Sequence, residues 1–122
     1  LARELLAGAG SDVLLASGQR AGWQPPVSLT AVLLPAAQAR PAYRTLDPNT
    51  LVLDDLPDDT GVLLVPDADR ARLLRQLTDR AAVVGPARPW IHASASYARA
   101  VRARALSSDI RDTEDHLPDL VL

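Results

Sequence analysis

Apolar residues recur at helical spacing near the start of the chain. This spacing predicts a helix over residues 1–9, which Gly8 would end because glycine readily adopts the left-handed conformation that closes helices. A second helix follows, with Ser11 as its expected N-cap and Gly22 as its stop. We expect these elements to form a helical lead-in over residues 1–23, packed on the domain that follows.

Four short runs of apolar residues predict the strands of a sheet. Pro35 ends the first run, and Pro41 limits the next segment to a short helix or a turn-rich loop. Turn-forming residues separate the second run from the third, so these two strands are expected to form a hairpin. The strands are expected over residues 27–34, 50–54, 61–65 and 81–84.

Two further helices are predicted around the last strand. Asp67 is the expected N-cap of the first, and the second covers residues 92–107. This order of elements indicates an α+β, ferredoxin-like fold, a four-stranded antiparallel sheet with helices on one face. Residues 108–122 are expected to form a loop that ends in a helical turn. The inward stripe of the last helix is predicted as Ser94, Tyr97, Val101 and Ala105.

Composition narrows the classes of function. The chain has 122 residues, enough for one domain core, and 48% of them are hydrophobic, as in globular proteins. It has no cysteine and only two histidines, which excludes thiol chemistry and a multi-histidine metal site. A net charge of −2 argues against nucleic-acid binding by this part, and no apolar run is long enough for a membrane span. The absence of methionine predicts a piece of a longer protein.

Carboxylates are concentrated in and around the predicted hairpin, where two interpretations compete. Closely spaced acids can hold Mg²⁺ or Ca²⁺ through their oxygens, but the alternating acids and central glycine of a calcium loop are absent. Aspartate is also a preferred turn and N-cap residue, and we favour this structural role. The acids concerned are Asp54, Asp55, Asp58, Asp59, Asp67 and Asp69.

The two histidines lie in different settings. His92 lies near Ser94 and Ser96, and His116 lies among several acids. A Ser–His–Asp arrangement is conceivable, but no nucleophile-elbow motif supports it. Histidine beside acids on a surface segment is more typical of a solvated ion pair.

Three arginines on the last predicted helix, Arg99, Arg102 and Arg104, are the candidate ligand-binding residues. Their guanidinium groups suit an anion or an acidic ligand, and the alternative is a solvated helix face. Trp23 and Trp90 are expected to pack in the core rather than to stack on a ligand.

Two stretches resemble known bacterial proteins. Residues 51–77, a strand, a turn, a strand, a proline and a helix, are similar to the hairpin region of GGDEF domains. Residues 82–106, in which a strand ending in Val-Gly precedes Ser-Tyr-x-x-Ala on a helix, resemble the central domain of PucR/CdaR-type transcription regulators. The opening ELLAG, the Gly18 and Gly22-Trp23 that close the second helix, and the final DHLPDLVL fit the same family.

The resemblance implies a degenerate relative of diguanylate cyclases. The cyclase signature needs two glycines so that the backbone can approach the nucleotide, whereas this turn has no glycine pair. The metal-binding aspartate that the family carries after its first strand is replaced by Leu34-Pro35-Ala36-Ala37. We therefore expect no catalytic residue, no cofactor and no metal. The degenerate signature turn consists of Pro57, Asp58, Asp59, Thr60 and Gly61.

The same resemblance implies a non-catalytic regulatory domain over residues 24–107, which serves dimerisation, signal relay or effector sensing in a bacterial cytoplasm. Residues 108–122 would connect it to a helix-turn-helix domain outside this chain, so DNA would be bound only there. A homodimer and an unidentified small-molecule effector are the expected partners, without a membrane. Two alternatives stay open: a nucleotide-binding or residually active GGDEF relative, and a stand-alone ferredoxin-like metabolite-binding module.

Overall fold

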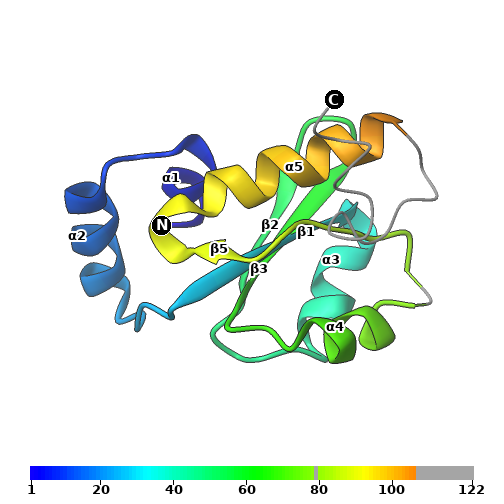
Figure 1. Cartoon of the computed structure of the whole chain (residues 1–122), viewed down its shortest axis with the longest axis horizontal. Coiled ribbons are helices and arrows are strands. Elements are labelled where there is room, and N and C mark those ends of the chain that lie inside the picture. The colour runs from blue at the N-terminus through cyan, green and yellow to red at the C-terminus, as the bar shows by residue number, and fades with distance from the viewer. Residues whose placement is uncertain (79, 107–122) are drawn as a thin grey trace.

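The computed structural model describes residues 1–78 and 80–106, so the predictions for residues 108–122 lie outside the described residues (Figure 1). Two helices precede the sheet, and helices alternate with strands after them. In chain order the elements are α1 (Ala2–Ala7), α2 (Ser11–Ala21), β1 (Ser28–Pro35), α3 (Ala36–Tyr43), β2 (Leu51–Leu56), β3 (Thr60–Pro66), α4 (Arg70–Gln76), β4 (Val83–Val84), β5 (Arg88–Pro89), the 3₁₀ turn η1 (Trp90–His92) and α5 (Ala93–Leu106).

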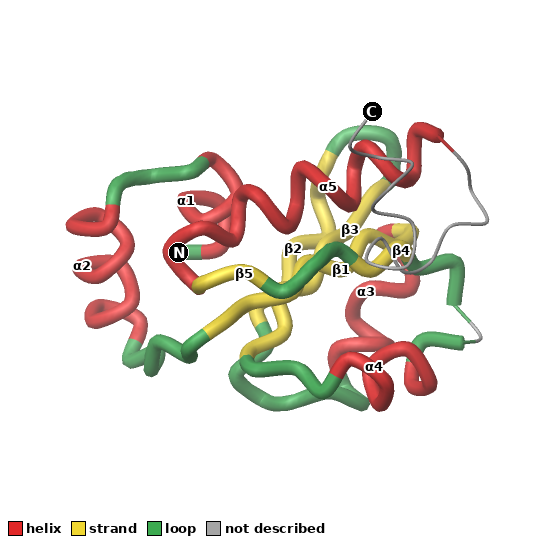
Figure 2. The backbone as a smooth tube through the Cα atoms, viewed as in Figure 1, coloured by secondary structure: helices red, strands yellow, loops and turns green. Residues whose placement is uncertain are grey.

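The strands form one open antiparallel sheet in the order β2-β3-β1-β4, and β5 pairs with the start of β1 (Figure 2). Val32 of β1 lies opposite Leu63 of β3, and β2 and β3 form the expected hairpin. The α+β class is confirmed, and a strand is found at each of the four predicted places. The two-residue β5 is an addition that the apolar pattern does not reveal.

Helices cover both faces of this sheet, so the prediction of helices on one face is wrong. On one side, Leu33 of β1 packs in a cluster with Leu5 of α1 and with the alanines of α5. On the other side, Leu34 packs with α3 and with Leu73 of α4. Figure 1 shows α1 and α5 on one side and α3 and α4 on the other. The composition of β1 is the cause, because a strand whose residues are mostly apolar, and buried from Leu29 to Leu34, requires cover on both faces.

The helix ends follow the expected glycines but not the expected N-caps: Gly10 is the N-cap of α2, and Ser11 is its first residue. Gly8 and Gly22 end α1 and α2 in the left-handed conformation, with φ of 74° and 67°. Asp69, not Asp67, is the N-cap of α4, and its side chain accepts the backbone N–H of Arg72. Pro41 lies inside the short helix α3. None of the helices in residues 1–78 and 80–106 is long and apolar enough to cross a membrane.

The two N-terminal helices are joined to each other and to the core. The Ser17 hydroxyl of α2 donates to a Glu4 carboxylate oxygen of α1 at 2.5 Å. This hydrogen bond, together with the N-terminal ammonium group, lowers the pKa of Glu4 below its ordinary value. Trp23, just after α2, meets Trp90 edge-on with ring centroids 5.7 Å apart. Both rings pack against the core cluster, which confirms the expected packing role.

The buried stripe of α5 is shifted by one position from the predicted one, and its members are all small. Val101 from the predicted stripe is 42% exposed. Small side chains carry little hydrophobic signal, but they allow a helix to lie close to a sheet. The fully buried residues of α5 are Ala93, Ser96, Ala100 and Ala103.

The closest approach of α5 to the sheet is at Gly85 and Ser96. A Cβ on Gly85 would lie 2.5 Å from the carbonyl oxygen of Ser96, so only glycine fits there. Gly85 donates its N–H to the Ala31 carbonyl at 2.7 Å, and Ala31 donates its own N–H to the Ser96 hydroxyl at 2.9 Å. β4 pairs with β1 from Val32 onward and β5 pairs only before Thr30. The Ser96 hydroxyl therefore serves as an acceptor where the sheet edge changes from one short strand to the other.

We predict that Ser96→Ala lowers the free energy of unfolding by about 1–3 kcal/mol, because the buried Ala31 N–H loses its acceptor. Urea denaturation followed by circular dichroism measures this change. The matched control is Ser94→Ala on the same helix, where no hydrogen bond to the sheet is lost and the change stays within about 0.5 kcal/mol. Equal effects of the two substitutions would contradict the assigned role of Ser96.

Candidate ligand-binding site

A cavity of about 410 Å³ lies between the β2–β3 turn and α5. Its floor comes from the sheet, where Leu33 is only 2% exposed, and from the half-buried Leu56 at the end of β2. The turn forms one wall and one flank of α5 forms the other. The described residues that line the cavity are Leu33, Leu56, Pro57, Asp58, Thr60, Tyr97, Val101, Arg104 and Ala105.

The α5 wall contains most of the stripe that the sequence pattern assigns to the core. Tyr97, Val101 and Arg104 follow one another at helical spacing and share one flank of the helix. Because small residues occupy the buried stripe beside them, these larger side chains are displaced toward the turn. The predicted stripe therefore has the correct helical spacing, but most of its residues line the cavity instead of packing in the core.

Arg104 crosses the cavity and contacts the turn. Its Nη1 donates to the hydroxyl of Thr60 at 2.8 Å, and the Thr60 side chain donates to the Asp58 carbonyl oxygen at 3.3 Å. Thr60 is buried at the start of β3, whereas Arg104 is exposed. The guanidinium, the hydroxyl and the turn backbone thus form a short chain of hydrogen bonds along the polar side of the cavity.

The turn itself has an unusual backbone. Asp58 and Asp59 both have left-handed φ angles, 63° and 54°. Hairpin turns with two such residues favour glycine and asparagine, because a Cβ in this conformation costs about 1 kcal/mol or more. The Asp59 carbonyl accepts the N–H of Ala36 at 2.7 Å, which ties the turn to the start of α3. Strained non-glycine turns of this kind are concentrated at functional sites.

Of the three candidate arginines, the structure brings only Arg104 to the cavity. Arg102 is exposed on another side of α5. Arg99 is half-buried, and its Nε and Nη2 atoms have no hydrogen-bond partner in the described part of the chain. Arg99 and Arg104 are five positions apart, which separates them by about 140° around a helix. The three side chains therefore do not form one anion site.

The acidic cluster is divided by the fold. Asp54 pairs with Arg40 at 3.0 Å, and Asp55 pairs with Arg3. Asp58 and Asp59 form the turn at one end of β3, while Asp67 and Asp69 lie at its other end. Within residues 1–78 and 80–106, no group of three or more acids and histidines is placed to hold a metal ion. These positions support the structural interpretation of the aspartates.

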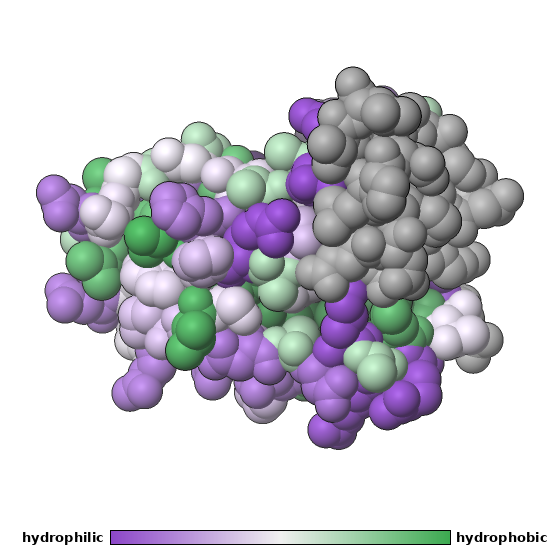
Figure 3. Space-filling view, viewed as in Figure 1, coloured by the Kyte–Doolittle hydropathy of each residue, from purple (hydrophilic) through white to green (hydrophobic). Residues whose placement is uncertain are grey.

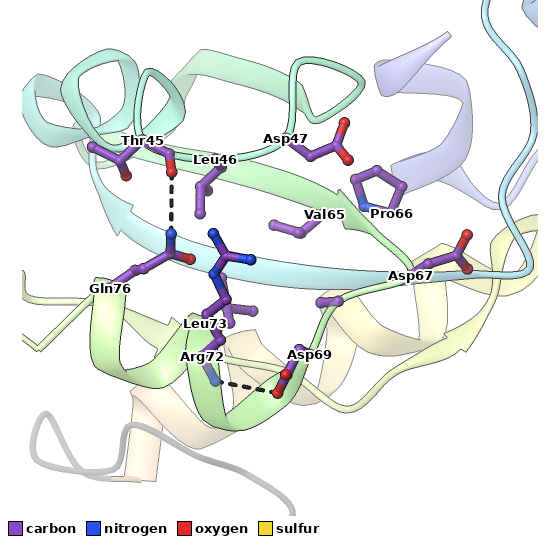
Figure 4. A pocket seen from close by; sticks show the side chains of 11 residues that line it. Thr45, Leu46, Asp47, Val65, Pro66, Asp67, Asp69, Arg72, Leu73 and Gln76 are labelled. Carbon is purple, nitrogen blue, oxygen red and sulfur yellow. Dashed lines mark hydrogen bonds between the residues drawn. The ribbon is translucent and has the colours of Figure 1, made fainter.

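A second cavity, of about 380 Å³, lies at the opposite end of β3 (Figure 4). Three of its carboxylates bind backbone: Asp67 accepts the N–H of Ser28 at 2.9 Å, and Asp47 and Asp69 accept N–H groups of nearby residues. The side-chain amide of Gln76 donates to the Thr45 carbonyl at 3.2 Å. Because these polar groups hold turns and a helix end together, we assign this cavity a structural role. Its lining consists of Thr45, Leu46, Asp47, Val65, Pro66, Asp67, Ala68, Asp69, Arg72, Leu73 and Gln76.

The imagined Ser–His–Asp arrangement gains no support. His92 is exposed in η1, and Ser96 is fully buried with its hydroxyl bonded to the Ala31 N–H. A buried hydroxyl in that position cannot reach a substrate. His116 lies outside the described residues.

Sequence reasoning identified the turn and Arg104 but missed the apolar part of the site. Leu33 and Leu56 belong to strands and carry no signal that separates a cavity floor from a core. Tyr97 could have been found, because it is the one aromatic residue of the last helix and lies seven positions before Arg104. Comparison of the chain with protein-family models, with curated proteins and with solved structures finds no match.

We predict that Asp58→Gly raises the free energy of unfolding by roughly 0.5–1 kcal/mol, because glycine relieves the left-handed strain at this position. The control is Asp12→Gly in the first turn of α2, which should lower it by about 1 kcal/mol. Urea titration measures both variants. A loss of stability in Asp58→Gly would show that the Asp58 side chain stabilises the turn by more than its backbone strain costs.

Proposed function

We propose that this chain is a non-catalytic regulatory domain of a bacterial, cytoplasmic PucR/CdaR-like transcription regulator, which relays a signal or mediates dimerisation. In this proposal residues 24–107 form the GGDEF-like domain, residues 1–23 form its helical lead-in, and residues 108–122 lead toward a DNA-binding domain. Contact with DNA belongs to that further domain. The support comes from the motif residues quoted above and from the way in which they touch one another.

The sheet supports the ferredoxin-like part of this proposal. β1 and β2 are separated by β3 and joined through α3, and α4 leads from β3 to β4 at the far side of β1. The chain order β1-α3-β2-β3-α4-β4 and the sheet order β2-β3-β1-β4 are those of two split βαβ units in a ferredoxin-like sheet. β5 extends the edge beyond β4 and pairs with the other end of β1.

The observation that carries the proposal is the hydrogen bond from Arg104 to Thr60. It joins the degenerate signature turn to the last turn of α5, two segments that are 44 positions apart in sequence. Within the second stretch, residues 82–106, Gly85 lies against Ser96 of α5. The bond from Arg104 to Thr60 thus joins the two stretches that carry the resemblance, which supports a relay between the hairpin and the last described helix.

The donor groups at the turn disfavour the cyclase alternative. The positively charged side chain of Arg104 contacts the turn, and it would repel a metal cation bound there. The Ala36 N–H at the start of α3 is already bonded to the Asp59 carbonyl, so it is not available to a phosphate. Asp58 and Asp59 occupy the left-handed positions of the turn. Glycine at these positions would let a nucleotide approach the backbone more closely.

We predict that the chain incubated with GTP and Mg²⁺ forms no cyclic dinucleotide, as measured by chromatography and mass spectrometry of the nucleotides. An active diguanylate cyclase assayed in the same buffer is the positive control. Cyclic dinucleotide made by the chain, and lost in Asp58→Ala, would refute the non-catalytic assignment and favour the residually active GGDEF relative.

Dimerisation has its best support in α2. This helix stands at one end of the molecule, and its Val13 and Leu15 are 47% and 46% exposed (Figure 1). Hydrophobic side chains reach the surface at this end in the space-filling view (Figure 3). Val13 and Leu15 are two positions apart and lie on different sides of α2; the support for a dimer is that a second copy packed on this helix would take exposed aliphatic surface out of water.

We predict that static light scattering at tens of micromolar gives twice the 13.0 kDa of one chain. The double variant Val13→Ser, Leu15→Ser should scatter as a monomer, because the exposed apolar residues of α2 are removed. Val101→Ser on α5, which removes a comparably exposed valine, should remain dimeric. A monomer for the unmodified chain would remove dimerisation from its proposed role.

A further inference from the structure

We infer that the cavity between the β2–β3 turn and α5 binds a small organic carboxylate with an apolar body. This inference rests on the proposed function, since it names the chemical class of the effector that the regulatory domain would sense. It follows from three properties of the cavity: its size, the single cation among its described lining residues, and the apolar surface opposite that cation.

The size of the cavity fits a small molecule. Its volume of about 410 Å³ lies in the lower part of the range of about 300–1,000 Å³ that is typical of ligand sites. It has a rigid floor, because Leu33 belongs to the central strand β1 and is 2% exposed. It also has walls from two separate segments, the turn and α5, so a ligand would contact both.

The cation of the cavity has unused donor capacity. Arg104 makes one hydrogen bond to a described residue, through Nη1 to Thr60. A guanidinium has several further N–H donors, arranged in a plane that matches the two oxygens of a carboxylate. The Thr60 hydroxyl lies 2.8 Å from Arg104, so it is placed beside the same ligand group. A carboxylate that replaces the Thr60 oxygen on Arg104 would accept from the Thr60 hydroxyl once that hydroxyl turns toward it from the Asp58 carbonyl.

The rest of the ligand would meet apolar side chains. Leu33 and Leu56 form the floor, and Val101 and the half-buried ring of Tyr97 form the α5 wall. An aromatic or branched aliphatic group would bury its surface against these residues, and an inorganic anion would leave them in contact with water. The apolar surface therefore favours a carboxylate that carries a hydrocarbon body.

The charge balance of the cavity selects against highly charged anions. Arg104 is the one cation and Asp58 the one anion among the described lining residues. Asp58 is exposed beside Thr60, so its carboxylate would repel a phosphate or a nucleotide triphosphate more strongly than a monoanion. A monocarboxylate satisfies Arg104 and adds only one negative charge.

Binding would act on the contact that the proposed relay uses. A carboxylate that takes up the guanidinium of Arg104 competes with the bond from Arg104 to Thr60. It would then bridge the turn and α5 in place of that bond. Because only an interaction that differs between two states can shift their balance, this exchange is the step at which a ligand could change the position of α5.

The test uses the 122-residue chain and sodium benzoate as the probe. In ¹H–¹⁵N NMR titrations at millimolar benzoate, we expect saturable shifts of amide signals from the turn and from α5. Arg104→Gln should weaken benzoate binding roughly tenfold or more, because it removes a charged hydrogen-bond donor. Arg102→Gln, which removes the same charge from another side of the same helix, should change binding by less than about twofold.

Two further probes separate the ligand classes. Benzamide, the neutral analogue, should bind much more weakly than benzoate, and inorganic phosphate should neither shift the same signals nor displace benzoate. Equal binding of benzamide, displacement by phosphate, or no saturable shift with benzoate would each overturn the assignment of a carboxylate site. None of these results alters the GTP assay or the light-scattering measurement, so the inference can fail while the proposed function stands.

Discussion

The fold depends on how closely α5 can approach the sheet at Gly85. With a side chain at this position, a Cβ would lie 2.5 Å from the Ser96 carbonyl oxygen, and the helix would have to move outward. The Ala31 N–H would then lose the Ser96 hydroxyl, its acceptor in the gap between β4 and β5. One glycine and one serine thus hold the last helix against the sheet edge and give the buried Ala31 N–H its acceptor.

The same approach creates the candidate site. With Ser96 and its small neighbours against the sheet, Tyr97, Val101 and Arg104 must face the β2–β3 turn. A similar contact fixes the other face, where a Cβ on Gly61 would lie 2.8 Å from the Cβ of Ala39. The chain lacks Phe and Met, and it has many Ala, Leu and Val residues. The core is therefore built of leucine and valine, with close contacts at glycine, alanine and serine on both faces of the sheet in place of buried phenylalanine and methionine.

Sequence patterns predict those features of this fold that are set within a few residues. Apolar runs locate the strands, and Gly8 and Gly22 locate two helix ends. The faces of the helices were predicted less well, because the core side of α5 consists of alanine and serine, which a hydrophobic pattern does not distinguish from a surface. The N-cap of α4 was placed at Asp67 instead of Asp69, since both aspartates suit a helix start and only the backbone path of β3 decides between them.

The candidate site was also only partly predictable from the sequence, because it depends on contacts between distant segments. The turn and Arg104 are each visible in the sequence, but their contact depends on the position of α5 on the sheet, which is itself set by Gly85 and Ser96. Where they meet, the turn and the exposed side chain of Arg104 share one partly buried hydrogen bond. The contact at Gly85 is buried and costly to break, whereas the bond from Arg104 to Thr60 lies beside a cavity, where the proposed ligand would compete for it. If the domain relays a signal as proposed, the movement would occur at the end of α5, and the Gly85–Ser96 contact would stay fixed.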